Sequence, residues 1–315
     1  MKRAAAAMVV AIAVSAMVPA MAEHIEGDVC PVEPSREFPA GFAIPIDYQA
    51  DLCKDASPHW QDLGVGGWGG GECPPGHTPR VPVVLVHGNT SDAWFWRAEA
   101  ESGDGSLVNV RQKFLDAGYC ANELWGISYA GEASPRGSYG SGYTTYVEIN
   151  AEETYQFLRA VMDFTGSGQV DVVGHSLGAT LLRKAMFLHR NDPPASNPYS
   201  FVRRAVMIAG GNHGTTGCRL GTIHHLNHVC EEHDPASPWL DELNSIGESP
   251  GPTEWMSICD CSGLVDSGYL LIDAESPLLA GSTQVRLRFT GHVMLARGQI
   301  GVDAYLPFLL EGNPA

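Results

Sequence analysis

One serine between two glycines constrains this chain more than any other feature. The stretch Gly174-His175-Ser176-Leu177-Gly178 follows a short apolar run, Val170–Val173, and precedes a segment with the composition of a helix, Ala179–His189. A serine on a tight turn between a strand and a helix is held in a strained backbone conformation, with its hydroxyl exposed above the sheet. The flanking glycines let neighbouring backbone pass without a Cβ clash. The stretch therefore predicts that Ser176 is a nucleophile.

The first residues have the features of a secretion signal. Lys2 and Arg3 precede an apolar segment, Ala4–Val18, which leads to the small-residue pattern Ala20-Met21-Ala22. This segment is shorter than the ~20 residues that span a bilayer. We expect residues 1–22 to be removed by cleavage after Ala22, leaving a secreted, extracellular protein with no integral membrane segment, with an uncleaved membrane anchor as the alternative.

The net charge excludes one class of partner. The formal charge is −17 at pH 7 over 315 residues, and it becomes more negative once the basic start of the signal is removed. Nucleic acids and anionic membrane surfaces are bound by basic patches. We therefore expect no nucleic-acid partner.

The cysteine content indicates disulfide bonds. The eight cysteines are Cys30, Cys53, Cys73, Cys120, Cys218, Cys230, Cys259 and Cys261. An even number of cysteines in an exported chain is typical of an oxidised protein. Cys218 and Cys230 bracket a loop and are the favoured pair, whereas the three N-terminal cysteines are expected to staple the N-terminal segment. Cys259 and Cys261 are expected not to pair with each other, because they are too close in sequence to do so without strain.

Strand-like and helix-like segments alternate from Val81 to the C-terminus. We expect strands at Val81–Val86, Leu124–Tyr129, Val170–Val173, Ala205–Ala209, Trp255–Cys259 and Val285–Phe289, and helices at Leu107–Ala117, Ile149–Phe164, Ala179–His189 and Asp303–Leu310. Such alternation predicts an α/β fold, a mostly parallel sheet with helices on both faces. Ligand sites in these sheets lie at the carboxyl ends of strands, where the Ser176 turn is placed.

Two parts of the chain depart from this alternation. Residues 23–80 are rich in Pro, Gly and Cys, and the run Gly64–Gly71 has no periodicity, so we expect an irregular N-terminal extension. Residues 210–253 are longer than a plain connection and predict a lid insertion, with a structural excursion as the alternative. The expected organisation is therefore a signal peptide, the extension, and a domain over residues 81–315 that carries the lid.

Acyl transfer through serine also needs a base and a carboxylate that orients it. Gly291-His292 comes just after the last expected strand, where a histidine can reach over the serine turn, so His292 is the candidate base. His175 directly precedes the serine. Since adjacent residues on a tight turn project in different directions, we expect His175 to pack beside the turn instead.

The sequence leaves the carboxylate open. Asp260 and Asp266 both follow the strand Trp255–Cys259 and lie between the serine and the histidine in chain order, as this architecture requires. Asp260 is preferred because it stands directly at the strand end, Asp266 lies further along the loop, and Asp273 is a third candidate. Each of them has an alternative role as a turn or cap residue.

An oxyanion hole should come from two backbone amides. One belongs to Leu177, the residue after the nucleophile, and the other to Asn89, which follows the apolar strand that ends at Val86. Gly88 is expected to permit the sharp bend that aims the Asn89 amide inward. His87 is expected to support this loop through a hydrogen bond.

These motifs together resemble a known family. Val83–Asn89, Gly174–Gly178 and Gly291-His292, in this order, resemble the α/β-hydrolase fold, and within it the secreted class 2 bacterial lipases and the extracellular depolymerases of amorphous poly(3-hydroxybutyrate). The resemblance covers roughly Val81 to Leu310. It implies hydrolysis of carboxylic esters by serine through an acyl-enzyme, a lipid or polyester ester as substrate, no metal or cofactor for the chemistry, and an oxyanion hole at the positions of Asn89 and Leu177.

The chain departs from this family pattern at the acid. Relatives commonly place the acid before a small residue and two aliphatics, and here Ser262 holds that position ahead of Gly263-Leu264-Val265. Either the acid has shifted along the chain or Asp266 serves.

The lid segment allows a rival chemistry. Its metal-binding side chains are His213, Cys218, His224, His225, His228, Cys230, His233 and Asp234. His224 and His228 have the i, i+4 spacing that can chelate zinc on a helix, although no His-Glu-x-x-His motif is present. A zinc-dependent hydrolase is therefore an alternative, as is a non-catalytic binding protein on a hydrolase scaffold.

An acyl chain would need an apolar approach to the serine. The candidates are Trp239, Leu240, Leu243, Ile246 and Trp255, for each of which ordinary core packing is the alternative.

Overall fold

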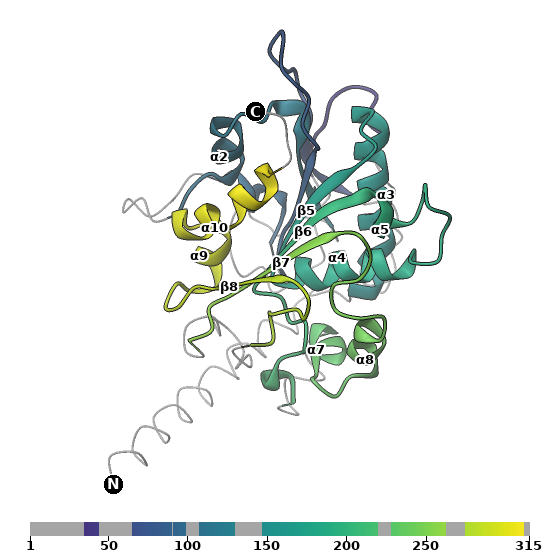
Figure 1. The fold of residues 1–315 in the computed structure, drawn as a ribbon, viewed down its shortest axis with the longest axis vertical. Helices are drawn as coiled ribbons and strands as arrows, with labels where there is room; N and C mark the ends of the chain where they lie inside the picture. Colours follow the sequence, from purple (N-terminus) through teal and green to yellow (C-terminus); the bar gives the residue numbers. More distant parts are fainter. Residues whose placement is uncertain are drawn as a thin grey trace, which may run out of the picture.

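A computed structural model of the protein describes residues 35–43, 65–89, 91–98, 107–129, 147–219, 228–262 and 275–311. Its centre is an eight-stranded sheet in the order β1-β2-β4-β3-β5-β6-β7-β8 (Figure 1). The parallel strands are β3 (Val83–Val86), β4 (Leu124–Ser128), β5 (Val170–His175), β6 (Val202–Ile208), β7 (Glu254–Cys259) and β8 (Thr283–Arg286). The predicted parallel α/β sheet is confirmed.

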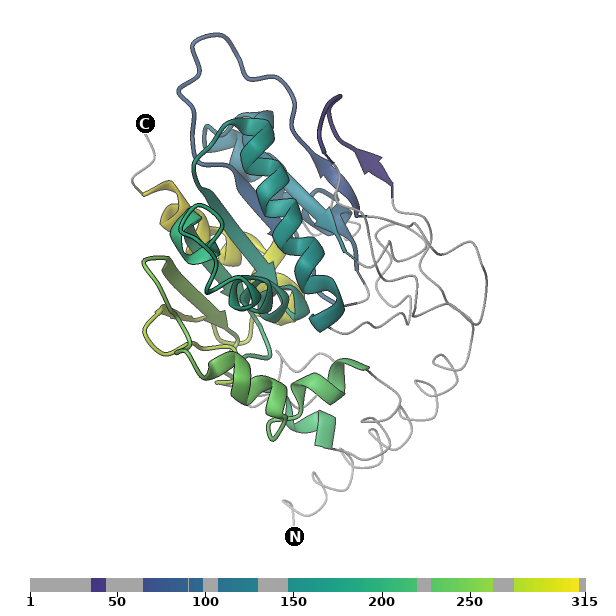
Figure 2. The same cartoon turned by 90° about the vertical axis from the view of Figure 1, so that its right-hand side faces the viewer.

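Helices cover both faces of the sheet. The helices α3 (Val147–Thr165) and α4 (Leu177–Leu188) lie on one face, and α2 (Val110–Asp116), α9 (His292–Arg297) and α10 (Gln299–Leu310) lie on the other (Figures 1 and 2). A short helix, α5 (Pro198–Phe201), leads into β6. Because the central strands are covered on both sides, they consist of continuous apolar runs rather than alternating ones.

The core is divided by the sheet into two layers. On β3, Val84 and Val86 belong to the cluster under α3 and α4, whereas Val83 and Leu85 belong to the cluster under α2 and α10. All four side chains are fully buried. Successive residues of a strand point to opposite faces, so one short apolar run supplies both layers.

The glycine-rich N-terminal segment contributes two short strands to the sheet, which the prediction of an irregular extension did not include. β1 (Arg36–Glu37) pairs with β2 (Gly66–Gly69), and β2 pairs antiparallel with β4. The glycines permit close packing: a Cβ on Gly126 of β4 would lie 2.7 Å from the ring of Trp68, which is itself buried. Because Gly126 has no side chain, the ring of Trp68 can pack directly against β4.

A disulfide between Cys73 and Cys120 ties this N-terminal segment to the chain just before β4. Cys73 therefore does not pair within the N-terminal segment as expected. Cys30 and Cys53 lie outside the described residues, as do residues 1–22 with the expected signal peptide.

The ends of several elements differ from the predicted ones. β6 begins at Val202 rather than Ala205, since Val202 pairs with Val170 of β5, and the charged Arg203 that follows it is bonded to the buried carboxylate of Asp171. The last strand is Thr283–Arg286 rather than Val285–Phe289, and a further helix, α9, precedes α10. Local apolar patterns do not show these long-range contacts.

The lid segment, residues 210–253, contains the short helices η5 (Thr216–Arg219), α7 (His228–His233) and α8 (Pro238–Asn244). The helices α7 and α8 lie beyond one end of the sheet (Figure 2). The segment follows β6, which places it at the carboxyl end of that strand. Within the part of the chain that the structure describes, no helix is both long and apolar enough to cross a membrane.

Candidate active site

Ser176 occupies a strained turn between β5 and α4. Its φ is 56° and its ψ is −122°, in a left-handed region that side chains with a Cβ rarely adopt. Its amide donates to the Ile208 carbonyl of the neighbouring strand at 2.8 Å. Such strain persists only where surrounding structure fixes it, and it clusters at functional sites.

Close backbone packing holds this turn. A Cβ on Gly174 would lie 2.6 Å from the Gly178 carbonyl oxygen, and a Cβ on Gly178 would lie 2.3 Å from the His87 carbonyl oxygen. Both distances are shorter than any real Cβ contact, so neither position accepts another residue without movement of the backbone. The two glycines of the motif therefore serve close approach, as the sequence predicts.

The loop after β3 lies directly against the serine. A Cβ on Gly88 would come within 2.9 Å of the Ser176 Cβ. The φ of Gly88 is outside the left-handed region, so its role is this close approach rather than the sharp bend expected. Asn89 follows on the same loop, and Leu177 is the first residue of α4, whose amide has no acceptor within the helix.

His87 supports this loop from the buried side. Its Nδ1 donates to the Gly88 carbonyl at 2.7 Å, and its ring stacks on Tyr129 with centroids 4.1 Å apart. The Tyr129 hydroxyl donates to the His87 carbonyl at 3.0 Å. Burial lowers the pKa of His87 to about 4, so the ring is neutral at pH 7. The expected supporting hydrogen bond is present.

His292 lies at the start of α9 and is partly exposed. The chain that leads to it is strained at Phe289, where φ is 59°, whereas Gly291 adopts its φ of 88° without strain. The amides of residues 289–291 all donate to the carboxylate of Asp260, at 2.7 to 3.0 Å. Asp260, fully buried at the end of β7, thus fixes the segment that carries His292.

The Asp260 carboxylate is ionised in this setting. Burial alone would raise its pKa, but hydrogen bonds from Ser262 and from the amides of Gly291 and Phe289 lower it. The structure therefore connects Asp260 to the segment that carries His292 through the backbone amides of that segment. Asp266 and Asp273, the other candidates, lie outside the described residues.

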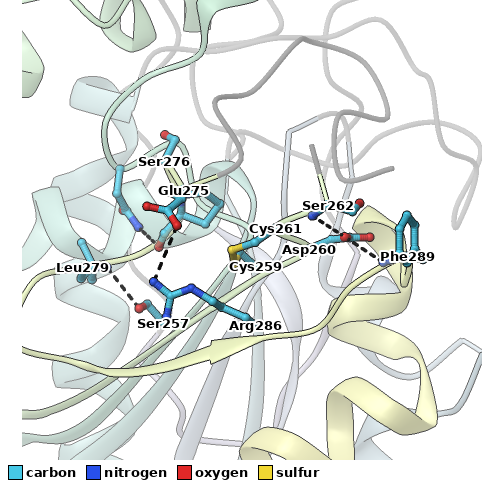
Figure 3. Close-up of a disulfide and its surroundings, with 12 residues drawn as sticks. Ser257, Cys259, Asp260, Cys261, Ser262, Glu275, Ser276, Leu279, Arg286 and Phe289 are labelled. Atoms are coloured by element: carbon cyan, nitrogen blue, oxygen red, sulfur yellow. Dashed lines mark hydrogen bonds and ion pairs between the residues drawn. A yellow bond between two sulfur atoms is a disulfide. The ribbon is translucent and has the colours of Figure 1, made fainter. Parts of the chain in front are cut away.

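The prediction that Cys259 and Cys261 do not pair is wrong. They form a disulfide that brackets Asp260. Figure 3 shows the Asp260 carboxylate between Ser262 and Phe289, close to this bond. The chain turns sharply as it leaves β7, and this turn brings the two sulfur atoms together although one residue separates them.

The lid segment is closed by the predicted disulfide Cys218–Cys230. His233, the last residue of α7, is buried. Its Nδ1 donates to the Val229 carbonyl at 3.0 Å, and its Nε2 lies 2.9 Å from the hydroxyl of Thr180 on α4. Burial lowers the pKa of His233 to about 4. Since a neutral ring has one N–H, Nε2 accepts from Thr180. His233 joins the lid segment to α4, the helix that follows Ser176.

The described lid histidines do not form a metal cluster. His213 bonds the Ser276 carbonyl and Glu248, and His233 has both ring nitrogens occupied. The residues His224 and His225 and the side chain of His228 lie outside the described part. Within that part, the grouped metal-binding atoms are those of Cys73, His77 and Cys120, whose two cysteines are joined in a disulfide.

The expected apolar approach consists mainly of core residues. Leu240, Leu243 and Trp255 are buried, and Trp239 packs on the core, whereas Ile246 is exposed. Sequence reasoning missed Phe289, which is 70% exposed close to Asp260 and His292. Only its position before Gly291-His292 could have indicated it.

The model of the class 2 lipase family matches residues 80–297, about the range over which these site elements are distributed. The chain belongs to the class 2 lipase family. Family membership makes it a hydrolase of the lipase and esterase class with the α/β-hydrolase fold. No curated protein matches the chain in sequence.

Solved structures share the fold of this lipase at low sequence identity. The mature form of the Bacillus licheniformis lipase BlEst2 is 15% identical, with a TM-score of 0.53 over 78% of this chain and 97% of that one. Its propeptide form has a TM-score of 0.54 at 15% identity, covering 79% of this chain and 54% of that chain. Aspergillus fumigatus lipase B has a TM-score of 0.51 at 14% identity, covering 93% and 67%.

The His87 carbonyl lies so close to Gly178 that a side chain at this position should destabilise the fold. Gly178→Ala should lower the free energy of unfolding by about 1–3 kcal/mol or more, because the new methyl group would overlap the His87 carbonyl. Gly168→Ala is the matched control, since no atom lies within 4 Å of its Cβ position. Urea unfolding of both variants measures the difference; equal stability would show that the turn is not tightly packed.

The buried neutral histidines generate an acid-stability prediction. In the unfolded chain a histidine binds its proton below about pH 6.5, whereas folded His233 and His87 do so near a pKa of about 4. The free energy of unfolding therefore keeps its full value above pH 6.5. It decreases as the pH falls toward 4, by on the order of 3 kcal/mol for each histidine, because only the unfolded chain takes up the proton.

Urea unfolding at several pH values tests this loss. His233→Phe, which cannot titrate, should show a shallower fall in unfolding free energy between pH 6.5 and 4 than the wild type. Parallel curves for the two proteins would mean that His233 is not held neutral.

Proposed function

We propose that this class 2 lipase is an exported serine hydrolase of carboxylic esters, with Ser176 as nucleophile, His292 as base and Asp260 as acid. The observation that carries the proposal is the left-handed φ of 56° at Ser176, at the end of β5. A strained serine between strand and helix is the arrangement that exposes a nucleophilic hydroxyl. The contacts of Asp260 with residues 289–291 support its role beside His292.

The proposed reaction proceeds through an acyl-enzyme. His292 accepts the Ser176 hydroxyl proton while Oγ attacks the ester carbonyl carbon, and the amides of Asn89 and Leu177 donate to the oxyanion. The carbon–oxygen bond to the alcohol then breaks, and His292 returns its proton to the leaving alkoxide. Water, deprotonated by His292, releases the carboxylic acid and regenerates the serine.

The substrate proposed is an apolar ester, either a lipid or a hydroxyalkanoate polyester. The exposed aromatic ring of Phe289, close to the proposed base, supports an apolar substrate because covering its apolar surface with an apolar ligand is favourable. The resemblance to both fat-cleaving and polyester-cleaving enzymes covers these two classes.

Export is proposed on the N-terminal sequence. Residues 1–22 have the composition of a signal peptide, and the mature chain would begin at Glu23. The three disulfides of the described residues fit an oxidising compartment.

Serine catalysis is tested by Ser176→Ala. We expect kcat on p-nitrophenyl butyrate to fall by at least about 1,000-fold, and by a similar factor in His292→Ala, because either change removes the nucleophile or its base. Ser245→Ala, a change of an exposed serine in the lid segment, is the matched control and should keep full activity.

The same assay separates the rival functions. Full activity of Ser176→Ala would reject the serine mechanism, and loss of wild-type activity with a chelator would favour a zinc-dependent hydrolase. No wild-type activity on p-nitrophenyl esters of any chain length or on polyhydroxybutyrate would favour a binding protein.

The acid is tested by comparing Asp260→Asn with Asp266→Asn. We expect Asp260→Asn to lower kcat by about 10⁴-fold, as expected when a base loses its orienting carboxylate, and Asp266→Asn to remain near wild type. A large loss only in Asp266→Asn would make Asp266 the acid and leave Asp260 as the anchor of the histidine segment. Thermal unfolding of both variants distinguishes lost chemistry from lost folding.

A further inference from the structure

His175, the last residue of β5, lies in the core directly beneath the proposed site. Its ring stacks on Phe95 with centroids 5.1 Å apart and planes 6° apart, and the ring of Trp96 contacts it edge-on at 6.4 Å. Both aromatic residues belong to η3 (Ala93–Trp96), which closely follows the loop of Asn89. The ring of His175 is thus fixed in one orientation.

One nitrogen of this ring bonds the proposed base. The Nε2 of His175 lies 3.1 Å from the carbonyl oxygen of His292, and the two rings have centroids 4.6 Å apart. A carbonyl oxygen can only accept, so Nε2 carries the proton and donates it. This bond joins the strand that ends at the nucleophile to the first residue of α9.

The other ring nitrogen faces the loop after β3, which carries Asn89 of the proposed oxyanion hole. The Nδ1 of His175 lies 3.3 Å from the Cβ position of Gly88, and it has no hydrogen-bond partner among the described residues. Gly88 also lies against Ser176. The buried ring of His175 therefore contacts both the loop after β3 and the segment that carries His292. His175 is also the residue directly before Ser176, the proposed nucleophile.

The ring is also uncharged. Burial, together with the neighbouring His292 and His87, keeps the pKa of His175 well below its usual range. A protonated His175 would place a second positive charge near His292 when that residue takes the serine proton. A neutral ring holds His292 in place without opposing its protonation.

We propose that His175 is a positioning residue, which holds the backbone of His292 through its Nε2–H so that the base keeps its alignment with Ser176. The proposal rests on the proposed function. Asp260 fixes the amides of residues 289–291, and His175 fixes the carbonyl of the next residue, so the base is held from both sides.

Two variants isolate the hydrogen bond from the packing. His175→Gln keeps a side-chain N–H at the reach of Nε2, whereas His175→Met has similar length and no donor. A displacement of the base by about 1 Å costs about 100-fold in rate. We expect His175→Met to lower kcat on p-nitrophenyl butyrate by about 10- to 100-fold with KM within about twofold, and His175→Gln to stay within about fivefold of wild type.

A double-variant cycle shows whether His175 acts through His292. In the His292→Ala background, His175→Met should lower the residual activity no further, because the base that it positions is gone. Should His175→Met not fold, His175→Asn, whose amide is too short to reach the His292 carbonyl, replaces it. Thermal unfolding confirms the folding of each variant.

Equal losses in His175→Gln and His175→Met would overturn the proposal and leave a packing role for the ring. A loss in the His292→Ala background as large as in the wild type would overturn it as well. These outcomes are distinguishable from a failure of the serine mechanism, which would appear as retained activity in Ser176→Ala or His292→Ala.

Discussion

The structure depends on close backbone packing at the carboxyl ends of its central strands. The glycines on either side of Ser176 bring β5, α4 and the loop after β3 closer together than any side chain would allow. Among the described residues, the non-glycine positions with left-handed φ are Ser176, Ala209 and Phe289, which follow β5, β6 and β8. Strain of this kind costs on the order of 1–3 kcal/mol per residue, and a well-packed sheet offsets it. The strained positions gather where the proposed site lies.

The histidines around this site divide into two electrostatic groups. His87, His175 and His233 are buried and uncharged, and each holds a different segment: the loop after β3, the start of α9, and the lid. His292 is partly exposed at the start of its helix. Neutral buried rings fix the geometry without adding charge, which is compatible with the proton-transfer role proposed for His292.

Local sequence patterns predicted the parts of the fold that local forces determine. The apolar run Val83–Val86 and the turn at Ser176 could be assigned because burial on both faces and glycine spacing leave direct marks in the sequence. Strand β2 was missed, since its glycines make room for Trp68 and thus look like turn residues. The candidate acids could not be separated, because the bonds of Asp260 reach residues 289–291, far along the chain. The Cys259–Cys261 pair was missed for the same reason: it depends on how the chain leaves β7.

Covalent labelling tests the central claim, that the strained serine is the nucleophile, most directly. A p-nitrophenyl phosphonate ester reacts with an activated serine and leaves a stable adduct, which peptide mass mapping can locate. The account predicts one adduct per chain, on Ser176, formed in proportion to the loss of esterase activity. Loss of activity with Ser176 unmodified, or full activity with Ser176 labelled, would contradict it.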